Sequence, residues 1–386
     1  MTRSAFIHVQ HLLGTGHFSR ALAIGRALAN KGVDVTLATG NTPPPLADLD
    51  GITLVELPPV RAKDARFKSF LTPEGKEIDD AWKAKRTEAT LTAFGARDFD
   101  LLLTETWPFG RRPFAFEMEP LVEAARGRDR PPVIAASVRD ILVRKQEVWK
   151  EEEMAERAEA AYDLVLVHSD PDFIRLEDSF PFTDRIAHLI AYTGFVDTAG
   201  ARPEAPEGDG RDEVIVSCGG GAVGIDLLRT AMSARARSKA AGDCRWRLLA
   251  GHDMDAQTFS RLAEAAANGV IVERARADFP SLLGRARCSV SQAGYNTVLD
   301  VLRAGVPSVL VPFAQIKETE QAQRADALVH HGRAVSVPEA ELTAERLADA
   351  VDQALAAPKR SGFSVRLGGA ESAAGILAGA LAERAA

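Results

Sequence analysis

The sequence predicts an α/β protein of two domains, each built on a doubly wound parallel sheet. Short apolar runs of strand type alternate with stretches of helical periodicity along the chain. Each half begins with a strand, a glycine-rich loop and a helix. Residues 197–212 are rich in Gly, Pro, Ala and acids and show no period, which is typical of a linker. We therefore expect an N-terminal domain at residues 1–196 and a C-terminal domain at residues 213–386.

The individual elements follow from the periodicity of the apolar residues. In the first half we expect strands at residues 5–10, 33–39, 52–57, 99–104, 133–137, 164–168 and 190–193, and helices at 18–31, 67–94 and 143–161. In the second half we expect strands at residues 214–217, 246–250, 270–273, 288–291, 308–312 and 334–337, and helices at 295–303 and 370–382. In sheets of this kind, ligands bind at the carboxyl ends of the strands.

Composition excludes several classes of protein. With 386 residues, 46% of them hydrophobic, each half can bury a core. A net charge of −7 argues against nucleic acid as the main partner. The three cysteines form no CxxC pair, which predicts neither a disulfide framework nor a metal site and fits the cytoplasm. We find no signal-peptide pattern and no apolar run of about 18 residues, so we expect no transmembrane span.

Two glycine-rich loops open the two halves. The first, Gly14-Thr15-Gly16-His17, lacks the third glycine of a dinucleotide fingerprint, and Ser19 stands in that place. The second strand is also not followed by a ribose-binding acid, so NAD is not expected. The second loop contains Ser217, Gly219, Gly220 and Gly221. It has the composition of a backbone nest for phosphate at the start of the next helix.

The segment 288–325 contains the strongest binding pattern. A turn at Gln292-Ala293-Gly294 precedes a helix that begins Tyr295-Asn296. A glycine at a helix start lets an anion approach the free backbone N–H groups. Asp300 follows Gly294 by roughly 9 Å along the helix axis, which suits a carboxylate that binds ribose hydroxyls. Glu320-Gln321 opens the next helix, where both side chains could bind sugar hydroxyls. Phosphate, ribose and sugar contacts in this order describe a nucleotide-sugar site.

This segment resembles the donor-binding region of glycosyltransferase family 28, in particular its MurG-type members. The residues that carry the resemblance are Gly294, Asp300, Val311-Pro312-Phe313 and Glu320-Gln321. Asp300 stands where those enzymes usually have Glu. The resemblance implies a GT-B fold, in which two Rossmann-like domains face each other across a cleft and the last helix often packs back on the first domain. It also implies UDP-N-acetylglucosamine as the donor.

The first loop is similar to the Gly-x-Gly-His pattern of the same enzymes, and Arg20 follows it. The resemblance implies that Gly14, Thr15 and Gly16 face the donor and that His17 is the base of an inverting, metal-independent transfer. The alternative is that His17 only caps the helix or orients the loop. Arg276 aligns with the stretch that binds uracil largely through backbone groups. The alternative is an ordinary exposed arginine.

The acceptor side is expected after the strand at residues 99–104. Glu105, Trp107, Arg111, Arg112 and Arg139 could receive an acceptor that carries phosphate or lipid. The alternative is a packed loop held by a surface ion pair. We expect the protein in the cytoplasm, and a lipid-bearing acceptor would add peripheral contact with the inner face of the plasma membrane.

Two rival functions stay open at this stage. A UDP-sugar hydrolase, similar to the nucleotide-sugar hydrolase of pseudaminic acid synthesis, would use His17 to activate water. A non-catalytic subunit that binds a nucleotide sugar is the second rival. In every case we expect no metal and no cofactor beyond the UDP-sugar.

Overall fold

The computed structural model describes residues 2–12, 15–44, 47–63, 69–197, 208–219, 224–313, 319–358 and 365–384. The chain divides into two compact units. Unit 1 comprises residues 1–198 and 366–386, and unit 2 comprises residues 199–365. No helix in the described ranges is both long and apolar enough to cross a membrane.

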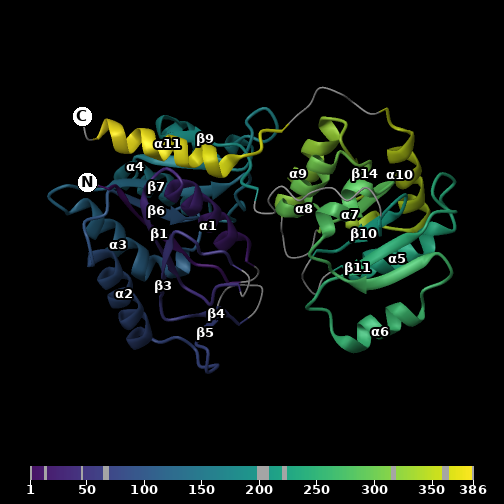
Figure 1. Cartoon of the computed structure of the whole chain (residues 1–386), viewed down its shortest axis with the longest axis horizontal. Helices are drawn as coiled ribbons and strands as arrows, with labels where there is room; N and C mark the ends of the chain where they lie inside the picture. The colour runs from purple at the N-terminus through teal and green to yellow at the C-terminus, as the bar shows by residue number, and fades with distance from the viewer. Residues whose placement is uncertain are drawn as a thin grey trace. The chain divides into compact units, whose positions relative to one another are not determined.

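Unit 1 contains a seven-stranded parallel sheet with the order β3-β2-β1-β6-β7-β8-β9 (Figure 1). Its strands are β1 Ser4–Val9, β2 Asp34–Thr39, β3 Ile52–Glu56, β6 Leu101–Glu105, β7 Val133–Arg139, β8 Leu164–His168 and β9 Ile190–Tyr192. A small antiparallel pair, β4 Arg61–Ala62 and β5 Phe70–Leu71, lies outside this sheet. The helices are α1 Gly16–Ala29, α2 Asp80–Gly95, α3 Ala115–Arg126, α4 Val148–Ala161 and α11 Gly369–Glu383.

Helices cover both faces of this sheet, which explains why its strands read as apolar runs. Alternate residues of β1 point to opposite faces. Ala5 and Ile7 belong to the core that contains α1 and α11. Phe6 belongs to the other core, with residues of α2, α3 and α4. The sheet is therefore the central layer of unit 1.

The C-terminal helix α11 completes unit 1 by packing against α1. The chain leaves this unit and returns to it at one place, where Phe195 N–H donates to the Arg366 carbonyl and Gly369 N–H donates to the Phe195 carbonyl. Gly194 has a φ of +81°, and a Cβ there would lie 2.7 Å from the Arg366 carbonyl oxygen. Glycine is required because the two backbones come this close.

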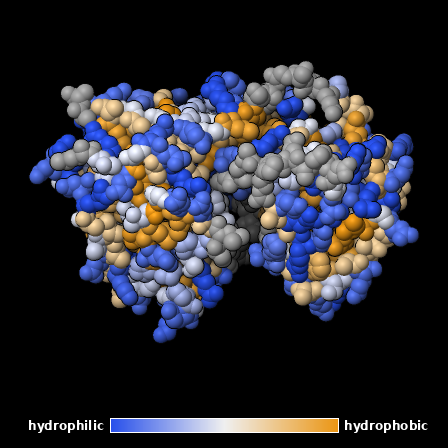
Figure 2. Space-filling view, viewed as in Figure 1, coloured by the Kyte–Doolittle hydropathy of each residue, from blue (hydrophilic) through white to orange (hydrophobic). Residues whose placement is uncertain are grey.

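Unit 2 contains a six-stranded parallel sheet with the order β12-β11-β10-β13-β14-β15 (Figure 1). Its strands are β10 Val214–Ser217, β11 Trp246–Ala250, β12 Val270–Arg274, β13 Cys288–Ser291, β14 Ser308–Leu310 and β15 Val335–Ser336. Its helices are α5 Ile225–Arg235, α6 Ala256–Glu264, α7 Phe279–Arg285, α8 Tyr295–Ala304, α9 Glu320–His330 and α10 Ala344–Ala356. Residues of α5, α6 and α10 form one core with the sheet, and α7 packs against α8. In both units, hydrophilic side chains cover much of the visible surface, between smaller hydrophobic patches (Figure 2).

The two doubly wound sheets confirm the predicted fold class. The predicted helix at residues 67–94 is wrong at its start. Phe70–Leu71 forms β5, and α2 begins only after Asp79, whose carboxylate accepts a hydrogen bond from Trp82 N–H. The helix α3 was not predicted, and it carries Pro120 within it.

Candidate functional site

Strand order selects one position in each sheet where a ligand can bind. In unit 1 the order reverses between β1 and β6, and in unit 2 it reverses between β10 and β13. At such switch points the loops leave in opposite directions, and the carboxyl ends of the two strands border a crevice. His17 follows β1 and Glu105 ends β6, whereas Ser217 ends β10 and Gln292 follows β13. These four predicted site residues therefore lie at the two switch points.

In unit 1 the switch point holds a bonded pair, His17 and Glu105. His17 is the second residue of α1, and its Nδ1 lies 2.9 Å from Glu105 Oε1. The imidazole remains 18% exposed, whereas the Glu105 side chain is almost completely buried. Arg20, one turn further along α1, forms an ion pair with the same carboxylate. The structure thus joins His17 to a carboxylate by its side chain, which a residue that only caps α1 would not require.

Protonation states follow from burial and from these partners. Burial lowers the pKa of His17 to about 3, against the opposing effect of its hydrogen bond to Glu105. Burial alone would raise the pKa of Glu105, but the Arg20 charge and the His17 hydrogen bond hold it well below its usual range. The pair is therefore a neutral imidazole beside a carboxylate. Nδ1 also lies 3.1 Å from an Arg20 nitrogen and 3.1 Å from the Thr106 hydroxyl. We assign the proton to Nδ1 because its shortest contact, at 2.9 Å, is with a carboxylate that can only accept, and this leaves the Nε2 lone pair to accept a proton.

The loop after β6 shapes the surroundings of this pair. Thr106 and Arg111 have φ values of 71° and 59°, in the left-handed region that non-glycine residues rarely adopt. Arg111 Nε donates to the Gln10 carbonyl at 3.0 Å. Burial lowers the pKa of Arg111 to about 10, and the charges of Arg139 and Arg20 add to this effect. Positive charge thus accumulates around Glu105.

The other residues predicted for the acceptor side, Trp107, Arg112 and Arg139, do not all lie near His17. Trp107 is 2% exposed and lies in the core of unit 1, so its ring is not available at the surface. Arg112 pairs with Glu153 at 3.0 Å and stacks on the exposed ring of Trp149 at 4.5 Å. Arg139 ends β7 and is half-buried. Only Glu105, Arg111 and Arg139 are therefore linked to the surroundings of His17, the arginines through their charges.

In unit 2 the loop after β10 begins with a local hydrogen bond. The Ser217 hydroxyl accepts from Gly219 N–H at 3.3 Å, and Gly219 has a φ of +75°. Gly220 and Gly221, which the sequence places in the same nest, lie outside the described residues, as does Gly14 of the first loop. Gln292 N–H contacts the Ser217 carbonyl at 3.4 Å. The two loops of this switch point are therefore bonded to each other.

The helix α8 starts at the other side of the switch point. Gly294 is its N-cap and provides no side-chain cap. The N–H groups of a first turn have no intrahelical acceptors and attract anions. Tyr295 and Asn296 open this turn, and Asp300 lies further along the helix, half-buried.

Gln321 and Arg324 of α9 hold the turn before α8. The Gln321 Oε1 atom accepts from Ala293 N–H and from Phe313 N–H, both at 3.1 Å. Arg324, 1% exposed, donates to the Ala293 carbonyl at 2.7 Å. Glu320 is buried and forms an ion pair with Arg324 at 3.7 Å. The oxygen of Gln321, predicted to bind sugar, is thus bonded to backbone, and this side chain positions the turn.

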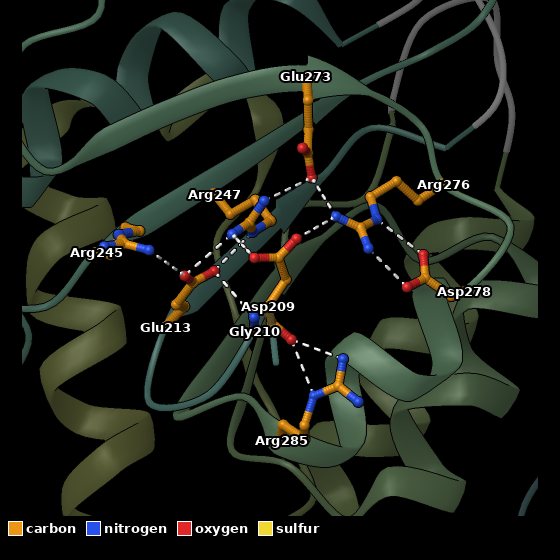
Figure 3. Close-up of polar contacts among 9 residues, drawn as sticks. All are labelled: Asp209, Gly210, Glu213, Arg245, Arg247, Glu273, Arg276, Asp278 and Arg285. Carbon is orange, nitrogen blue, oxygen red and sulfur yellow. Dashed lines mark hydrogen bonds and ion pairs between the residues drawn. The ribbon is translucent and has the colours of Figure 1, made fainter. Parts of the chain in front are cut away.

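Arg276 belongs to an ion network on the edge of unit 2 (Figure 3). Its guanidinium pairs with Asp278 and with Asp209, each at 2.7 Å, and with Glu273 at 3.4 Å. These carboxylates raise the pKa of Arg276, with Asp278 and Asp209 as the main causes. The Arg276 side chain is therefore committed to carboxylates, and its place beside the uracil stays a prediction.

Arg247 of β11 is the buried centre of the same network (Figure 3). It is 3% exposed and pairs with Glu213 at 2.6 Å, with Asp209 at 3.0 Å and with Glu273 at 3.0 Å. Arg285 of α7 donates to the Asp209 carbonyl. The network fixes the residues that lead into β10. This ion network was not predicted from the sequence, although Arg247 inside an otherwise apolar strand is a signal for a buried ion pair.

Comparison with known proteins agrees with this geometry. Residues 215–364 match the glycosyltransferase family 28 C-terminal domain. A UDP-N-acetylglucosamine–N-acetylmuramyl-(pentapeptide) pyrophosphoryl-undecaprenol N-acetylglucosamine transferase of an Exiguobacterium species is 40% identical over 78 residues, and that of Agrobacterium fabrum is 36% identical over 83 residues. These alignments cover 20% and 22% of this chain and 22% of each relative, so the chain spans about a fifth of the length of these relatives.

Solved structures resemble the whole chain. MurG of Acinetobacter baumannii gives a TM-score of 0.61 at 16% identity, covering 98% of this chain and 99% of that one. The calicheamicin glycosyltransferase CalG4 gives 0.59 at 17% identity, covering 100% of this chain and 95% of that one. Likeness at this level of identity shows the fold, and the fold is GT-B.

Proposed function

We propose that this chain, which carries a glycosyltransferase family 28 C-terminal domain within a GT-B fold, is an inverting glycosyltransferase. It moves N-acetylglucosamine from UDP-N-acetylglucosamine to an acceptor hydroxyl. The observation that carries the proposal is the neutral His17 held by Glu105 at the switch point of unit 1. The start of α8, at the switch point of unit 2, supports it, because the N–H groups of a helix start without a side-chain cap can attract an anion.

The donor binds to unit 2 in this proposal. The diphosphate lies against the first turn of α8 and the loop that begins at Ser217 and Gly219, where backbone N–H groups favour negative charge. Asp300 accepts hydrogen bonds from the ribose, and Glu320 binds the sugar. Gln321 supports the turn rather than the sugar, because its oxygen is bonded to Ala293 and Phe313 N–H.

The chemistry is a direct displacement. The acceptor hydroxyl oxygen attacks the anomeric carbon, and its proton passes to Nε2 of His17. The bond between the anomeric carbon and the diphosphate oxygen breaks, and the sugar configuration inverts. The helix start of α8 stabilises the negative charge of the departing UDP. Glu105 stabilises the imidazolium that forms.

The acceptor carries an anionic group, phosphate or a phosphate-linked lipid, in this proposal. Arg111 and Arg139 supply the positive charge that would receive it, since Arg20 already neutralises Glu105.

The first experiment identifies the donor. A thermal-shift screen across nucleoside diphosphate sugars should show the largest stabilisation with UDP-N-acetylglucosamine, because a ligand of the native state raises its apparent stability. If a different nucleotide sugar gave the largest stabilisation, that compound would be the donor in place of UDP-N-acetylglucosamine. If no nucleotide sugar stabilised the protein, the proposal would be refuted.

The second experiment separates transfer from hydrolysis and from binding alone. His17→Ala should abolish turnover while UDP binding persists. Full activity of this variant would contradict the role of His17. Release of free N-acetylglucosamine at full rate without an acceptor would favour the hydrolase. Turnover is expected to persist in EDTA, and strict dependence on Mg²⁺ or Mn²⁺ would contradict the metal-independent mechanism.

A further inference from the structure

A chain of buried polar side chains continues beyond Glu105, away from His17. The Ser137 Oγ atom lies 2.5 Å from Glu105 Oε2 and 2.9 Å from His168 Nε2. His168 Nδ1 lies 2.8 Å from the Thr193 hydroxyl. Ser137, His168 and Thr193 are 1%, 0% and 5% exposed. These hydrogen-bonded side chains come from neighbouring strands. Ser137 of β7 pairs in register with Glu105 of β6, and His168 is the last residue of β8.

The positions of the protons along this series of hydrogen-bonded side chains follow from what each group can donate or accept. Glu105 is ionised and can only accept, so the single hydroxyl proton of Ser137 is directed to it. The contact between Ser137 and His168 then requires a proton on Nε2 of His168. Burial lowers the pKa of His168 to about 3, so the ring is neutral and only one nitrogen carries a proton. With that proton on Nε2, Nδ1 accepts from the Thr193 hydroxyl, which also lies 2.7 Å from the Gly194 carbonyl oxygen. The two histidines thus carry their protons on opposite nitrogens, Nδ1 in His17 and Nε2 in His168.

This arrangement constrains the carboxylate between them. Arg20 bonds both oxygens of Glu105, Ser137 bonds Oε2, and the Thr106 hydroxyl and His17 Nδ1 both lie within hydrogen-bond distance of Oε1. If His168 offered a lone pair instead, it would compete with Glu105 for the Ser137 proton. The carboxylate would then lose one of the hydrogen bonds that fix its plane, and the acceptor for His17 Nδ1–H would be held less firmly.

We propose that His168, acting through Ser137, is a positioning residue for His17. By donating from Nε2, it commits the Ser137 proton to Glu105, and the fixed carboxylate holds His17 in the Nδ1–H tautomer with Nε2 available. The effect on turnover rests on the proposed function. The tautomer of His17 does not, because it is a property of the free protein.

The test uses three single substitutions, each made in the complete two-unit protein. His168→Gln keeps an N–H donor near the place of Nε2, His168→Leu removes it, and Ser137→Ala breaks the link with a smaller change in volume. The tautomer of His17 is read from the ¹⁵N NMR shifts of its ring nitrogens, without substrate. We expect a single Nδ1–H tautomer in the unmodified protein and in His168→Gln, and a mixture of tautomers in His168→Leu and Ser137→Ala.

Turnover provides the second readout. For His168→Leu and Ser137→Ala we expect kcat to fall by at least about tenfold, while KM for the UDP-sugar stays within about threefold. The fall in kcat is only part of the rate that a positioned base contributes, because His17 itself is still present. His168→Gln should restore most of kcat. If His168→Leu does not fold, Ser137→Ala decides by the same two measurements.

A matched control is His8, another buried histidine of unit 1. Its Nε2 lies 3.6 Å from Glu117 Oε1, and it is not part of the hydrogen-bonded series from Glu105 to Thr193. His8→Gln should leave the His17 tautomer and kcat unchanged. An unaltered His17 tautomer in both disruptive variants would overturn the proposal. Altered tautomers together with no sugar transfer from any UDP-sugar would instead refute the proposed function and leave the positioning role intact.

Discussion

Nδ1 of His17 lies 2.9 Å from Oε1 of Glu105, although 88 residues separate the two in sequence. The strand order of unit 1 brings them together, since β1 and β6 are neighbours at the switch point. The contact combines a neutral imidazole with a buried carboxylate that can stabilise its protonated form.

Replacement of this carboxylate should mainly affect catalysis. Glu105→Gln keeps the volume but removes the charge that orients and stabilises His17, so we expect kcat to fall by about 100-fold or more. Affinity for UDP, measured by calorimetry, should be unchanged. The control is Glu117→Gln, which alters another buried carboxylate, paired with Arg86, and should affect stability rather than kcat. Equal kcat losses in the two variants would contradict the assigned role.

The pH dependence of turnover should lack a limb near the ordinary histidine pKa. Burial lowers the pKa of His17 from 6.5 to about 3 in the free protein, so the base stays unprotonated from pH 8 down to mildly acid pH. We therefore expect kcat/KM to be flat between about pH 5 and 7, because this parameter reports the free enzyme. A tenfold fall across that range would show that His17 titrates normally.

The stability of unit 1 should decrease in mild acid. Burial lowers the pKa values of His17 and His168 from 6.5 to about 3, so between these values the unfolded chain binds protons that the native state does not. The free energy of unfolding should therefore fall as pH decreases below about 6.5, by about 1.4 kcal/mol per pH unit for each such histidine. Denaturant titrations at pH 7, 6 and 5 measure this slope. His168→Gln should reduce it, and an unchanged slope would argue against a buried neutral His168.

The turn before α8 should depend on Gln321. Gln321→Leu removes the acceptor of Ala293 and Phe313 N–H, which leaves two backbone donors unsatisfied. We expect UDP affinity to fall by about tenfold, equivalent to about 1.4 kcal/mol, because the helix start shifts. Gln323→Leu, on the same helix, is the matched control and should bind UDP normally. Isothermal titration measures both, and equal affinities would show that the turn does not need Gln321.

The ion network in Figure 3 should stabilise unit 2. Arg247→Met leaves Glu213 buried without its main partner, which should cost about 3–5 kcal/mol. Arg237→Met, which breaks an exposed pair with Glu345, should cost less than about 1 kcal/mol. Hydrogen exchange of the β10 and β11 amides reports the difference. Similar protection in the two variants would mean that the network contributes little.

The strands were predictable because burial on both faces leaves continuous apolar runs. The strands Trp246–Ala250 and Cys288–Ser291 begin and end where the sequence analysis placed them. The start of α2 was not predictable from apolar spacing, because the segment before it is polar and β5 has only two residues. The proline in α3 hid that helix for a related reason, since Pro usually ends a helical pattern.

The candidate site was predictable only as separate motifs. A glycine loop with a histidine suggested His17, but nothing local indicates that Glu105 is its partner, and Glu105 was instead expected to bind the acceptor. Likewise, Gln321 was expected to contact sugar, whereas its oxygen bonds backbone groups of two other segments. Such pairings depend on which strands are neighbours, and the spacing of residues along the chain does not contain that information.

The docking of α11 on α1 has a consequence for biosynthesis. The ribosome makes every residue of unit 2 before it makes α11. Until then, the core that contains Ala21 and Leu28 of α1 lacks the side chains that α11 contributes to it. Unit 1 therefore cannot complete its packing before all of unit 2 has been synthesised.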